Sequence, residues 1–386
     1  MISKKKSPLR FIQIPLSELK RITQREINYY KIKPTHALLF ITFRCTSRCR
    51  MCAMWKRGKN ANIREELSLD EWKIVMDMLS ELGVSIVEFF GGDALLRKDV
   101  LIPLIEYAHN KDIFTELPTN CNLLDKSTAT RLVEAGLDVV WISLDGIGST
   151  HDSVRGKQGT FEHVNEAIKN LMEAKNDNNT PKIMINCVIS KMNLGNFEEI
   201  ISYASEMNIE GIDFEYVGEI PSASILNSRI DGVIPTPFYI SSYDSLLLNE
   251  KEAVFLKKKL AVLKETFHGN GKLRINTTKI DCLTTKDLTQ GRFPNKRCYI
   301  CRNIVTIDPY GNVMGCLHFN NYYFGNVRNE TLARIWKNEK HHRFLKHQKR
   351  RKIQICDYCS NGVFRNFTPF QSFQSLYYEA TGKSKS

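Results

Sequence analysis

The 386-residue sequence lacks any apolar run that approaches the length of a membrane-spanning helix. Its basic start, Met1 to Lys6, is not followed by the apolar core of a secretory signal peptide either. We therefore expect a cytoplasmic protein without a membrane span. Because disulfides are disfavoured in that compartment, the eleven cysteines of the chain indicate metal binding rather than cross-links.

The sequence also lacks an internal repeat and any recognised nucleic-acid-binding motif. It is nevertheless basic, with a formal net charge of +13, and its lysines are scattered apart from one dense run at residues 346–352. A general basic bias accounts for such a charge, so we do not expect nucleic acid to be the partner. The alternative that stays open is a basic protein, stabilised by zinc or an iron–sulfur site, that binds nucleic acid without catalysis.

Segments with strand character alternate with helical spacing from residue 36 to residue 217. Six strands are predicted, at 36–42, 84–90, 113–118, 138–144, 182–189 and 211–217. This alternation predicts an α/β fold with a parallel sheet and right-handed crossovers. Because sites in such folds form at the C-terminal ends of the strands, we expect the polar loops after these segments to converge.

Three cysteines, Cys45, Cys49 and Cys52, follow the first predicted strand with the spacing C-x3-C-x2-C. Three thiolates on one tight loop can hold three irons of a [4Fe-4S] cluster, whereas structural sites normally have four protein ligands. The fourth iron can then bind a small molecule. The stretch resembles the signature of the radical S-adenosylmethionine (radical SAM) superfamily, with Met51 at a position that is usually aromatic. The resemblance implies a partial (β/α)6 barrel with a [4Fe-4S] cluster and S-adenosyl-L-methionine as cofactors.

Further motifs at strand ends resemble the cofactor-binding positions of that superfamily. Gly91-Gly92-Asp93 resembles its Gly-Gly-Glu motif for the methionyl ammonium group, and the shorter Asp93 implies a contact through backbone carbonyls. Paired glycines also let the backbone approach a ligand closely. Ser143 and Asp145 are candidates for binding ribose hydroxyls, Arg155 for the methionyl carboxylate, and Asn186 is a further polar candidate. The alternatives are a simple turn, strand-end capping and a surface salt bridge.

A second group of cysteines surrounds a β-hairpin that is predicted to turn at 309–312. Cys298 and Cys301 precede the hairpin, Cys316 follows it, and Cys356-x2-Cys359 comes after a helix-like segment at 332–346. The block resembles the SPASM/twitch extension of radical SAM enzymes, which implies one auxiliary [4Fe-4S] cluster. The implied ligands are Cys298, Cys316, Cys356 and Cys359, with Cys301 as a substitute for Cys298. A zinc ribbon on the two C-x2-C pairs is the alternative, but it leaves Cys316 unexplained.

Four parts of the chain follow from these motifs. We expect a basic N-terminal extension (1–35), a radical SAM core barrel (36–217), a linker with a helix (218–280), and a cysteine-rich α+β domain of hairpin and helix with a tail (281–386). Three histidines of the last part, His318, His341 and His342, are expected at the surface.

The resemblance implies an enzyme that cleaves S-adenosylmethionine reductively to a 5′-deoxyadenosyl radical. That radical would abstract a hydrogen atom from a small molecule or peptide, and the auxiliary cluster would help to oxidise or modify this substrate. The reaction implies a one-electron reductase such as flavodoxin or ferredoxin as a partner.

Overall fold

The computed structural model describes residues 33–360, except 177, 240–244, 268–272, 294–297 and 299. Nearly all of the predicted N-terminal extension and the tail after residue 360 lie outside the described residues. The six predicted strands are confirmed, with boundaries within two residues of those expected: β1 (His36–Thr42), β2 (Ile86–Gly91), β3 (Phe114–Thr119), β4 (Val139–Ser143), β5 (Lys182–Ile189) and β6 (Gly211–Tyr216).

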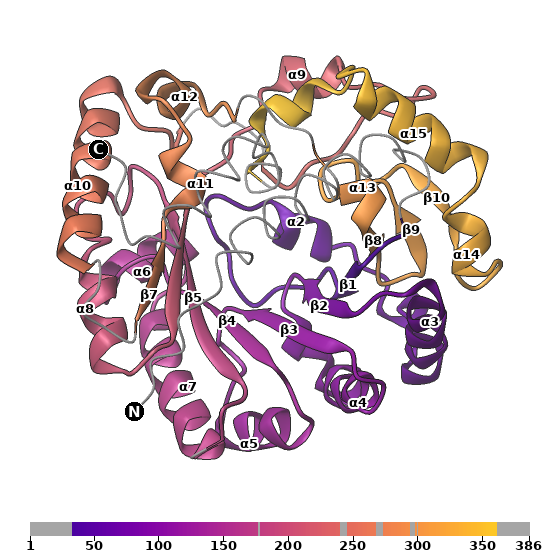
Figure 1. Cartoon of the computed structure of the whole chain (residues 1–386), viewed down its shortest axis with the longest axis horizontal. Helices are drawn as coiled ribbons and strands as arrows, with labels where there is room; N and C mark the ends of the chain where they lie inside the picture. Colours follow the sequence, from indigo (N-terminus) through magenta and orange to yellow (C-terminus); the bar gives the residue numbers. More distant parts are fainter. Residues whose placement is uncertain are drawn as a thin grey trace, which may run out of the picture.

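These six strands lie side by side in chain order and all pair in parallel. Amphipathic helices connect them and follow one another around the outside of the curved sheet (Figure 1): α3 (Leu69–Leu82), α4 (Lys98–His109), α5 (Lys126–Glu134), α7 (Thr160–Lys175) and α8 (Glu199–Glu206). Local signals fix the helix ends. Ser68 and Glu71 form a capping box at the start of α3, and Gly83 ends it in the left-handed conformation with φ of 87°.

The sheet continues beyond the six strands at both edges. The short strand β7 (Arg274–Asn276) pairs in parallel with β6 after the helices α9 (Ser222–Leu226) and α10 (Glu250–Phe267). At the other edge, the predicted hairpin is present as β8 (Ile304–Ile307) and β9 (Asn312–Met314), and β8 pairs in parallel with β1. With β10 (Tyr323–Asn326) on β9, one ten-stranded sheet therefore runs from the barrel into the cysteine-rich part of the chain.

The C-terminal helices differ from the prediction. The segment 332–346 is two helices, α14 (Leu332–Ile335) and α15 (Glu339–Lys349), because the Asn338 side chain accepts a hydrogen bond from the His341 backbone and starts a new helix. The short helices α11 (Thr278–Asp281), α12 (Thr285–Gln290) and α13 (Ile300–Asn303) precede the hairpin. Of the helices that the structure describes, none combines the length and apolar character needed to cross a bilayer.

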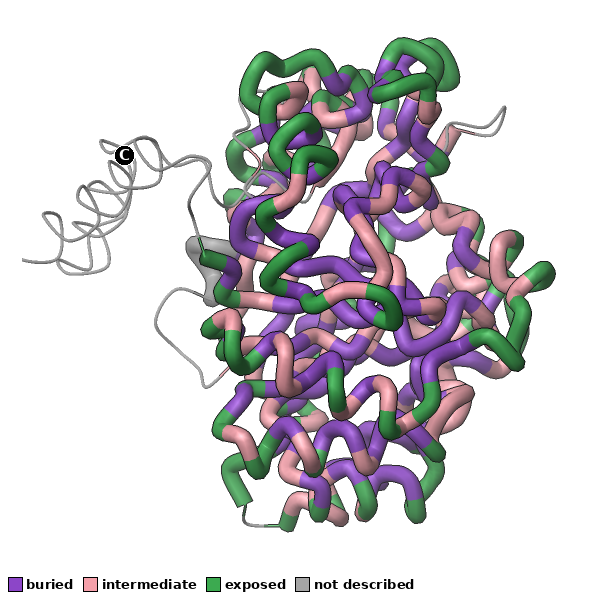
Figure 2. Tube along the Cα trace, turned by 90° about the vertical axis from the view of Figure 1, so that its right-hand side faces the viewer, coloured by how far each residue is buried: buried purple, intermediate pink, exposed green. Residues whose placement is uncertain are grey.

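Alternating residues of β1 pack on the two faces of the sheet. Leu39 and Ile41 belong to the large core under the helices, whereas Leu38 and Phe40 join a smaller cluster with Met54. Figure 2 shows that the buried segments run through the middle of the molecule and that exposed segments gather at its outer loops. The smaller cluster lies on the inner face of the sheet and supports the loop that follows β1.

Candidate active site

The cysteine loop, residues 43–52, leaves the C-terminal end of β1 and is held by backbone hydrogen bonds to the segment after β2 and to the end of helix α6 (Ser149–Arg155). On one side, the N–H groups of Gly92 and Asp93 donate to the carbonyls of Thr42 (2.9 Å) and Arg44 (2.8 Å). On the other side, Arg48 donates its N–H to the carbonyl of Arg155 at 3.1 Å. The segments that follow β2 and β4 thus converge on the loop, as the predicted parallel sheet requires.

The glycines beside this loop serve its packing. A Cβ atom on Gly91 would lie 2.3 Å from the Thr42 carbonyl oxygen, and one on Gly92 would lie 2.1 Å from the Arg44 carbonyl oxygen. A Cβ atom on Gly156, which follows α6 (Ser149–Arg155), would lie 2.4 Å from the Arg48 carbonyl oxygen. No side chain fits at these distances, so the glycines allow backbone to meet backbone. The paired glycines were expected to let the backbone approach a ligand. In the structure they let the backbone approach the cysteine loop.

Hydrogen bonds from polar side chains also hold the cysteine loop in place. The Thr46 hydroxyl donates to Asp93 Oδ2 at 2.5 Å, and Asn122 Nδ2 donates to the hydroxyls of Thr46 (3.0 Å) and Ser47 (2.9 Å). Burial raises the pKa of Asp93, which also accepts from the Leu95 N–H. Asp93 is therefore a support of the loop and does not line the cavity described below.

Hydrogen-bond donors point at the three thiols. The N–H of Ser47 lies 3.4 Å from Cys45 Sγ, the N–H of Met54 lies 3.4 Å from Cys52 Sγ, and Arg155 Nη1 lies 3.8 Å from Cys49 Sγ. Burial raises the pKa of Cys45 to about 11 and that of Cys52 to about 12, so both are protonated at neutral pH without a bound cation. Metal binding must release these protons, and the donors would then stabilise the thiolates. This donor set fits an iron–sulfur cluster.

The three cysteines open onto one cavity of about 200 Å³ at the strand ends. Five of the seven residues predicted to bind the cofactor also line it: Gly91, Gly92, Ser143, Arg155 and Asn186. The Asn186 Oδ1 atom is buried and has no hydrogen-bond partner, so it is an acceptor that a ligand can satisfy. Asp93 and Asp145 lie outside the lining.

Asp145 holds Arg155 in place. Its side chain is fully buried, Oδ2 lies 2.7 Å from Arg155 Nη2, and Oδ1 accepts from the Val188 N–H at 2.9 Å. The Arg155 side chain is also largely buried, at 12% exposure, so the alternative of a surface salt bridge is wrong. Asp145 therefore positions a guanidinium that lies between the thiols and the cavity.

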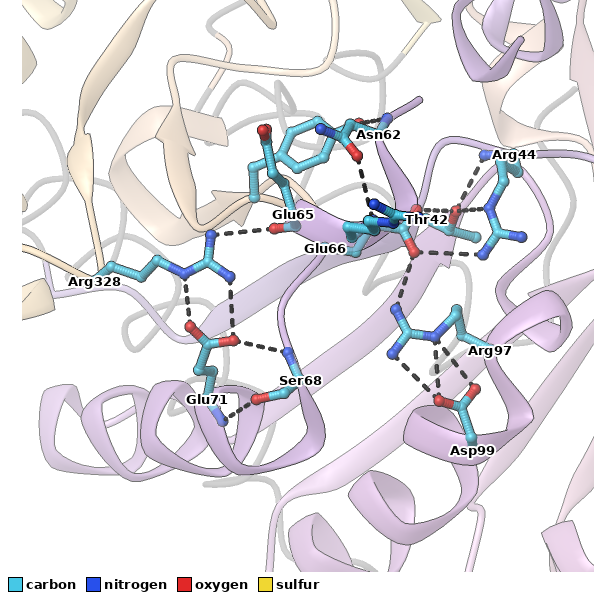
Figure 3. Close-up of polar contacts among 12 residues, drawn as sticks. Thr42, Arg44, Asn62, Glu65, Glu66, Ser68, Glu71, Arg97, Asp99 and Arg328 are labelled. Carbon is cyan, nitrogen blue, oxygen red and sulfur yellow. Dashed lines mark hydrogen bonds and ion pairs between the residues drawn. The ribbon is translucent and has the colours of Figure 1, made fainter. Parts of the chain in front are cut away.

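A buried carboxylate that the motifs did not indicate fixes the entry to the cysteine loop (Figure 3). Glu66 accepts a hydrogen bond from the Thr42 hydroxyl at 2.6 Å and forms ion pairs with Arg97 (2.9 Å) and Arg44 (3.4 Å). Arg44 immediately precedes Cys45. The Glu66 side chain is fully buried, so the two guanidinium groups and the hydroxyl satisfy its charge.

The hairpin of the cysteine-rich part is fastened to the barrel near this carboxylate. Arg328, two residues after β10, donates to both carboxylate oxygens of Glu71 on α3 and to the carbonyl of Glu65 (Figure 3). The N–H of Leu67 donates to the Pro309 carbonyl at 2.7 Å. The hairpin turn thus rests on the chain that leads from the cysteine loop into α3.

The second group of cysteines also gathers in space. Cys298, Cys316 and Cys356 are all close enough to Cys301 to interact electrostatically with its thiol, and Cys316 interacts in turn with Cys359. Burial raises the pKa of Cys316 to about 12. The structure therefore brings the predicted auxiliary cysteines together around the hairpin. Cys301 directs its thiol to the carbonyl of Gly315 at 2.5 Å.

Two histidines are buried, contrary to the expectation of surface positions. His341 is 3% exposed, and its ring contacts the carbonyls of Trp336 and Cys301, so it joins α14, α15 and α13. His318 is also 3% exposed and packs its ring on Tyr239. His342 is exposed, as expected. Helical spacing around Phe344 could have indicated the burial of His341, whereas nothing local indicates that of His318.

Tyr239 and Ser360 connect the cavity to the second group of cysteines. Both line the cavity, and Ser360 directly follows Cys359. Tyr239 interacts electrostatically with Cys52, Cys49 and Cys359. The cavity therefore extends from the first group of thiols toward Cys359 of the second group. Sequence reasoning missed Tyr239 because residues 218–244 show no periodicity.

Comparison with known families agrees with this geometry. Residues 39–204 match the family model of the radical SAM superfamily, and residues 298–360 match that of SPASM, an iron–sulfur cluster-binding domain. The chain contains a radical SAM domain and a C-terminal SPASM domain. Its cofactors are a [4Fe-4S] cluster with S-adenosylmethionine and auxiliary iron–sulfur in the SPASM domain.

The curated relatives of this chain differ in their named activities. Fe-coproporphyrin III synthase of Methanosarcina barkeri is 30% identical over 51% of the chain and 48% of the relative. PqqA peptide cyclase of Bradyrhizobium diazoefficiens is 31% identical over 47% and 46%. The matched part thus spans about half the length of these two relatives. AdoMet-dependent heme synthase of Methanosarcina barkeri matches at 24% identity over 85% of the chain and 90% of the relative.

Solved structures share the fold of this chain. SuiB of Streptococcus suis, crystallised with the precursor peptide SuiA, superposes with a TM-score of 0.60 at 15% identity, over 94% of this chain and 79% of SuiB. A likeness at this identity concerns the fold alone, and it agrees with the α/β barrel and the hairpin-containing C-terminal part.

Proposed function

We propose that Cys45, Cys49 and Cys52 hold a [4Fe-4S] cluster, that S-adenosylmethionine lies in the adjoining cavity, and that the enzyme oxidises or otherwise modifies a small molecule or peptide by hydrogen-atom abstraction. The convergence of three half-buried cysteines and their hydrogen-bond donors on one cavity carries this proposal. When bound, the cluster supplies the electron that splits the sulfonium of S-adenosylmethionine, which yields the 5′-deoxyadenosyl radical.

The residues of the cavity have distinct proposed roles. Arg155, held by Asp145, presents a fixed guanidinium to the methionyl carboxylate, because a planar fork suits a carboxylate. Gly91 and Gly92 expose backbone rather than side chains to the methionyl ammonium group. Ser143 and Asn186 offer hydrogen bonds to the cofactor, and the unsatisfied Oδ1 of Asn186 supports that role. The cavity walls would exclude water from the radical.

We propose one auxiliary [4Fe-4S] cluster on Cys298, Cys316, Cys356 and Cys359. The hydrogen bond from the Cys301 thiol to the Gly315 carbonyl supports its assignment as the surplus cysteine. The cavity reaches Ser360 and Tyr239 beside this group, so a substrate there would lie between the two clusters. Such a position offers a place for the electron that remains on the substrate, or an anchor for the substrate itself.

The proposed context is a cytoplasmic reaction that depends on a one-electron reductase such as flavodoxin or ferredoxin. The eleven cysteines, all within the described residues, form no disulfide, which suits a reducing compartment. One curated relative is named for a tetrapyrrole, Fe-coproporphyrin III synthase, and another for a peptide, PqqA peptide cyclase. The proposed substrate class therefore includes small molecules and peptides.

The test is reductive cleavage of S-adenosylmethionine by the reconstituted protein. Under anaerobic conditions, with iron, sulfide and dithionite, the wild type should form 5′-deoxyadenosine, detected by chromatography with mass detection. Cys49→Ala should abolish the product, whereas Cys282→Ala, at an exposed cysteine outside both groups, should not change it. A loaded and reducible protein that forms no 5′-deoxyadenosine, or full activity of Cys49→Ala, would contradict the proposal.

A further inference from the structure

The charged residues in the stretch of sequence that contains the first cysteine group are all positively charged. Residues 43–64 contain seven arginines and lysines and no aspartate or glutamate. Two of the seven serve the fold, because Arg44 pairs with Glu66 and Arg57 packs over the Phe43 ring at 4.2 Å. The others are exposed and leave a basic surface beside the thiols.

Three of these exposed cations surround one tryptophan on α2 (Met54–Gly58; Figure 1). Arg48, Lys56 and Lys59 lie 5.3, 5.4 and 5.2 Å from the centroid of the Trp55 ring. We name these four residues the Trp55 patch. Cation–π contacts hold the charges over the ring but leave their net charge in place.

No carboxylate within the described part of the chain pairs with the cations of the Trp55 patch. Elsewhere, lysines such as Lys126 and Lys175 pair with Glu173 and Glu210. Arg48 uses Nη1 only for the carbonyls of Cys45 and Ser47, both at 2.8 Å. The patch therefore presents uncompensated positive charge, which attracts acidic partners and speeds their association.

Trp55 joins this surface directly to the thiols. Its Nε1 donates to the Cys49 carbonyl at 3.4 Å, and its side chain also lines the cavity. The hydrogen bond between Trp55 and Cys49 thus links the patch directly to the first cysteine group. A partner that docks there comes close to the cluster without entering the cavity.

We propose that the Trp55 patch is the docking site of an acidic one-electron carrier protein. The inference rests on the proposed function, in which the first cluster needs one electron for each cleavage. The reduced carrier gives up one electron and leaves oxidised by one, and the cluster on Cys45, Cys49 and Cys52 gains that electron. An aromatic ring among cations also suits single-stranded nucleic acid, but the contact of Trp55 with Cys49 favours electron entry.

The experiment compares a patch variant with a charge-matched control. Lys56→Glu/Lys59→Glu reverses two charges of the patch, and Lys340→Glu/Lys346→Glu reverses two exposed charges on α15. Both proteins are reconstituted and given either dithionite or a reduced acidic flavodoxin. Flavodoxin affinity, the rate of cluster bleaching and 5′-deoxyadenosine are measured at 50 and 300 mM salt, and RNA binding is measured in parallel.

The patch variant should lose at least tenfold in flavodoxin affinity and flavodoxin-driven reduction at low salt. It should match the wild type with dithionite, and the control should stay within twofold of the wild type. Equal losses in both variants would mean that only net charge matters, and an unaffected patch variant would overturn the proposal. Loss of RNA binding with unchanged reduction by flavodoxin would assign the patch to nucleic acid instead. If the wild type also fails with dithionite, the proposed function itself fails.

Discussion

Replacement of Glu66 tests whether the buried carboxylate organises the entry to the cysteine loop. Glu66→Gln keeps the shape of the side chain and an oxygen that accepts from the Thr42 hydroxyl. It removes the negative charge that Arg97 and Arg44 face at 2.9 and 3.4 Å, and its amide adds a donor beside two guanidinium groups. The two cations then lack their shared counter-charge.

The expected cost follows from burial. Removing one partner of a buried ion pair typically costs about 3–5 kcal/mol, because the other charge is left without compensation. Arg97 keeps Asp99 as a partner at 3.2 Å, and Arg44 and Arg97 keep 24% and 14% of their side chains exposed. The remaining ion pair and water therefore relieve part of this cost. We expect Glu66→Gln to lower the free energy of unfolding by about 2–4 kcal/mol.

Glu71→Gln is the matched control, because it breaks an Arg–carboxylate pair at the surface. Glu71 and Arg328 are 36% and 37% exposed, and such pairs contribute less than about 1 kcal/mol. Glutamine at this position can still accept from the Ser68 N–H and keep the capping box. Comparison with this control therefore shows whether a loss of stability comes from the burial of the Glu66 charge or from the loss of any negative charge.

The assay is urea unfolding of the wild type and both variants under anaerobic conditions, with iron content measured alongside. Glu66→Gln should lower the midpoint clearly more than Glu71→Gln and should also lower the iron retained at the first cysteine group. If the two variants lose the same stability, or if Glu66→Gln loses less than about 1 kcal/mol, the charge of Glu66 does not hold this region together and the argument is refuted.

Three further changes test other parts of the site. Gly92→Ala should prevent loading of the first cluster, since its Cβ would lie 2.1 Å from the Arg44 carbonyl oxygen; iron and sulfide analysis checks this, and normal loading would contradict it. Cys316→Ala should reduce iron from about eight to about four atoms per chain if one auxiliary cluster is present, whereas unchanged iron would exclude Cys316 as a ligand. Burial lowers the pKa of His151 to about 3, below its unfolded value of 6.5, so its contribution to stability is complete above pH 6.5 and is lost as the pH falls toward 3. In His151→Asn, the free energy of unfolding should therefore change less with pH between about pH 6.5 and about pH 4 than it does in the wild type. The same pH dependence in both proteins would contradict this.

Local patterns in the sequence were enough for the barrel and for the cysteines. The strands were predictable because fully buried parallel strands are continuous apolar runs, as in residues 36–42. The capping box at Ser68 and the stop at Gly83 depend only on neighbouring residues, so the start and end of α3 were predictable as well. The spacing of Cys45, Cys49 and Cys52 is likewise a local property of one loop.

Other features depended on contacts between distant segments. The partners of Glu66 come from two separate stretches, at residues 42–44 and at Arg97, and nothing near residue 66 indicates them. Asp145 matched a cofactor-binding motif, yet its carboxylate points to Arg155 in the interior. The pairing of β8 with β1, which joins the predicted hairpin to the barrel sheet, was not indicated by the sequence. Side-chain direction and strand pairing across hundreds of residues leave no periodic signal.

The sequence by itself determined the chemistry that is available: three thiols on one loop, five more around a hairpin, and strands that bring polar loops to one edge of a sheet. These follow from spacing, periodicity and turn residues, which act over a few positions. Only the tertiary structure decided that the cavity beside the first group of thiols reaches Tyr239 and Ser360, next to Cys359, and that Glu66 and Asp145 hold the arginines beside Cys45 and Cys49. The physical reason is that burial and ion pairing are properties of segments that meet only after the chain has folded.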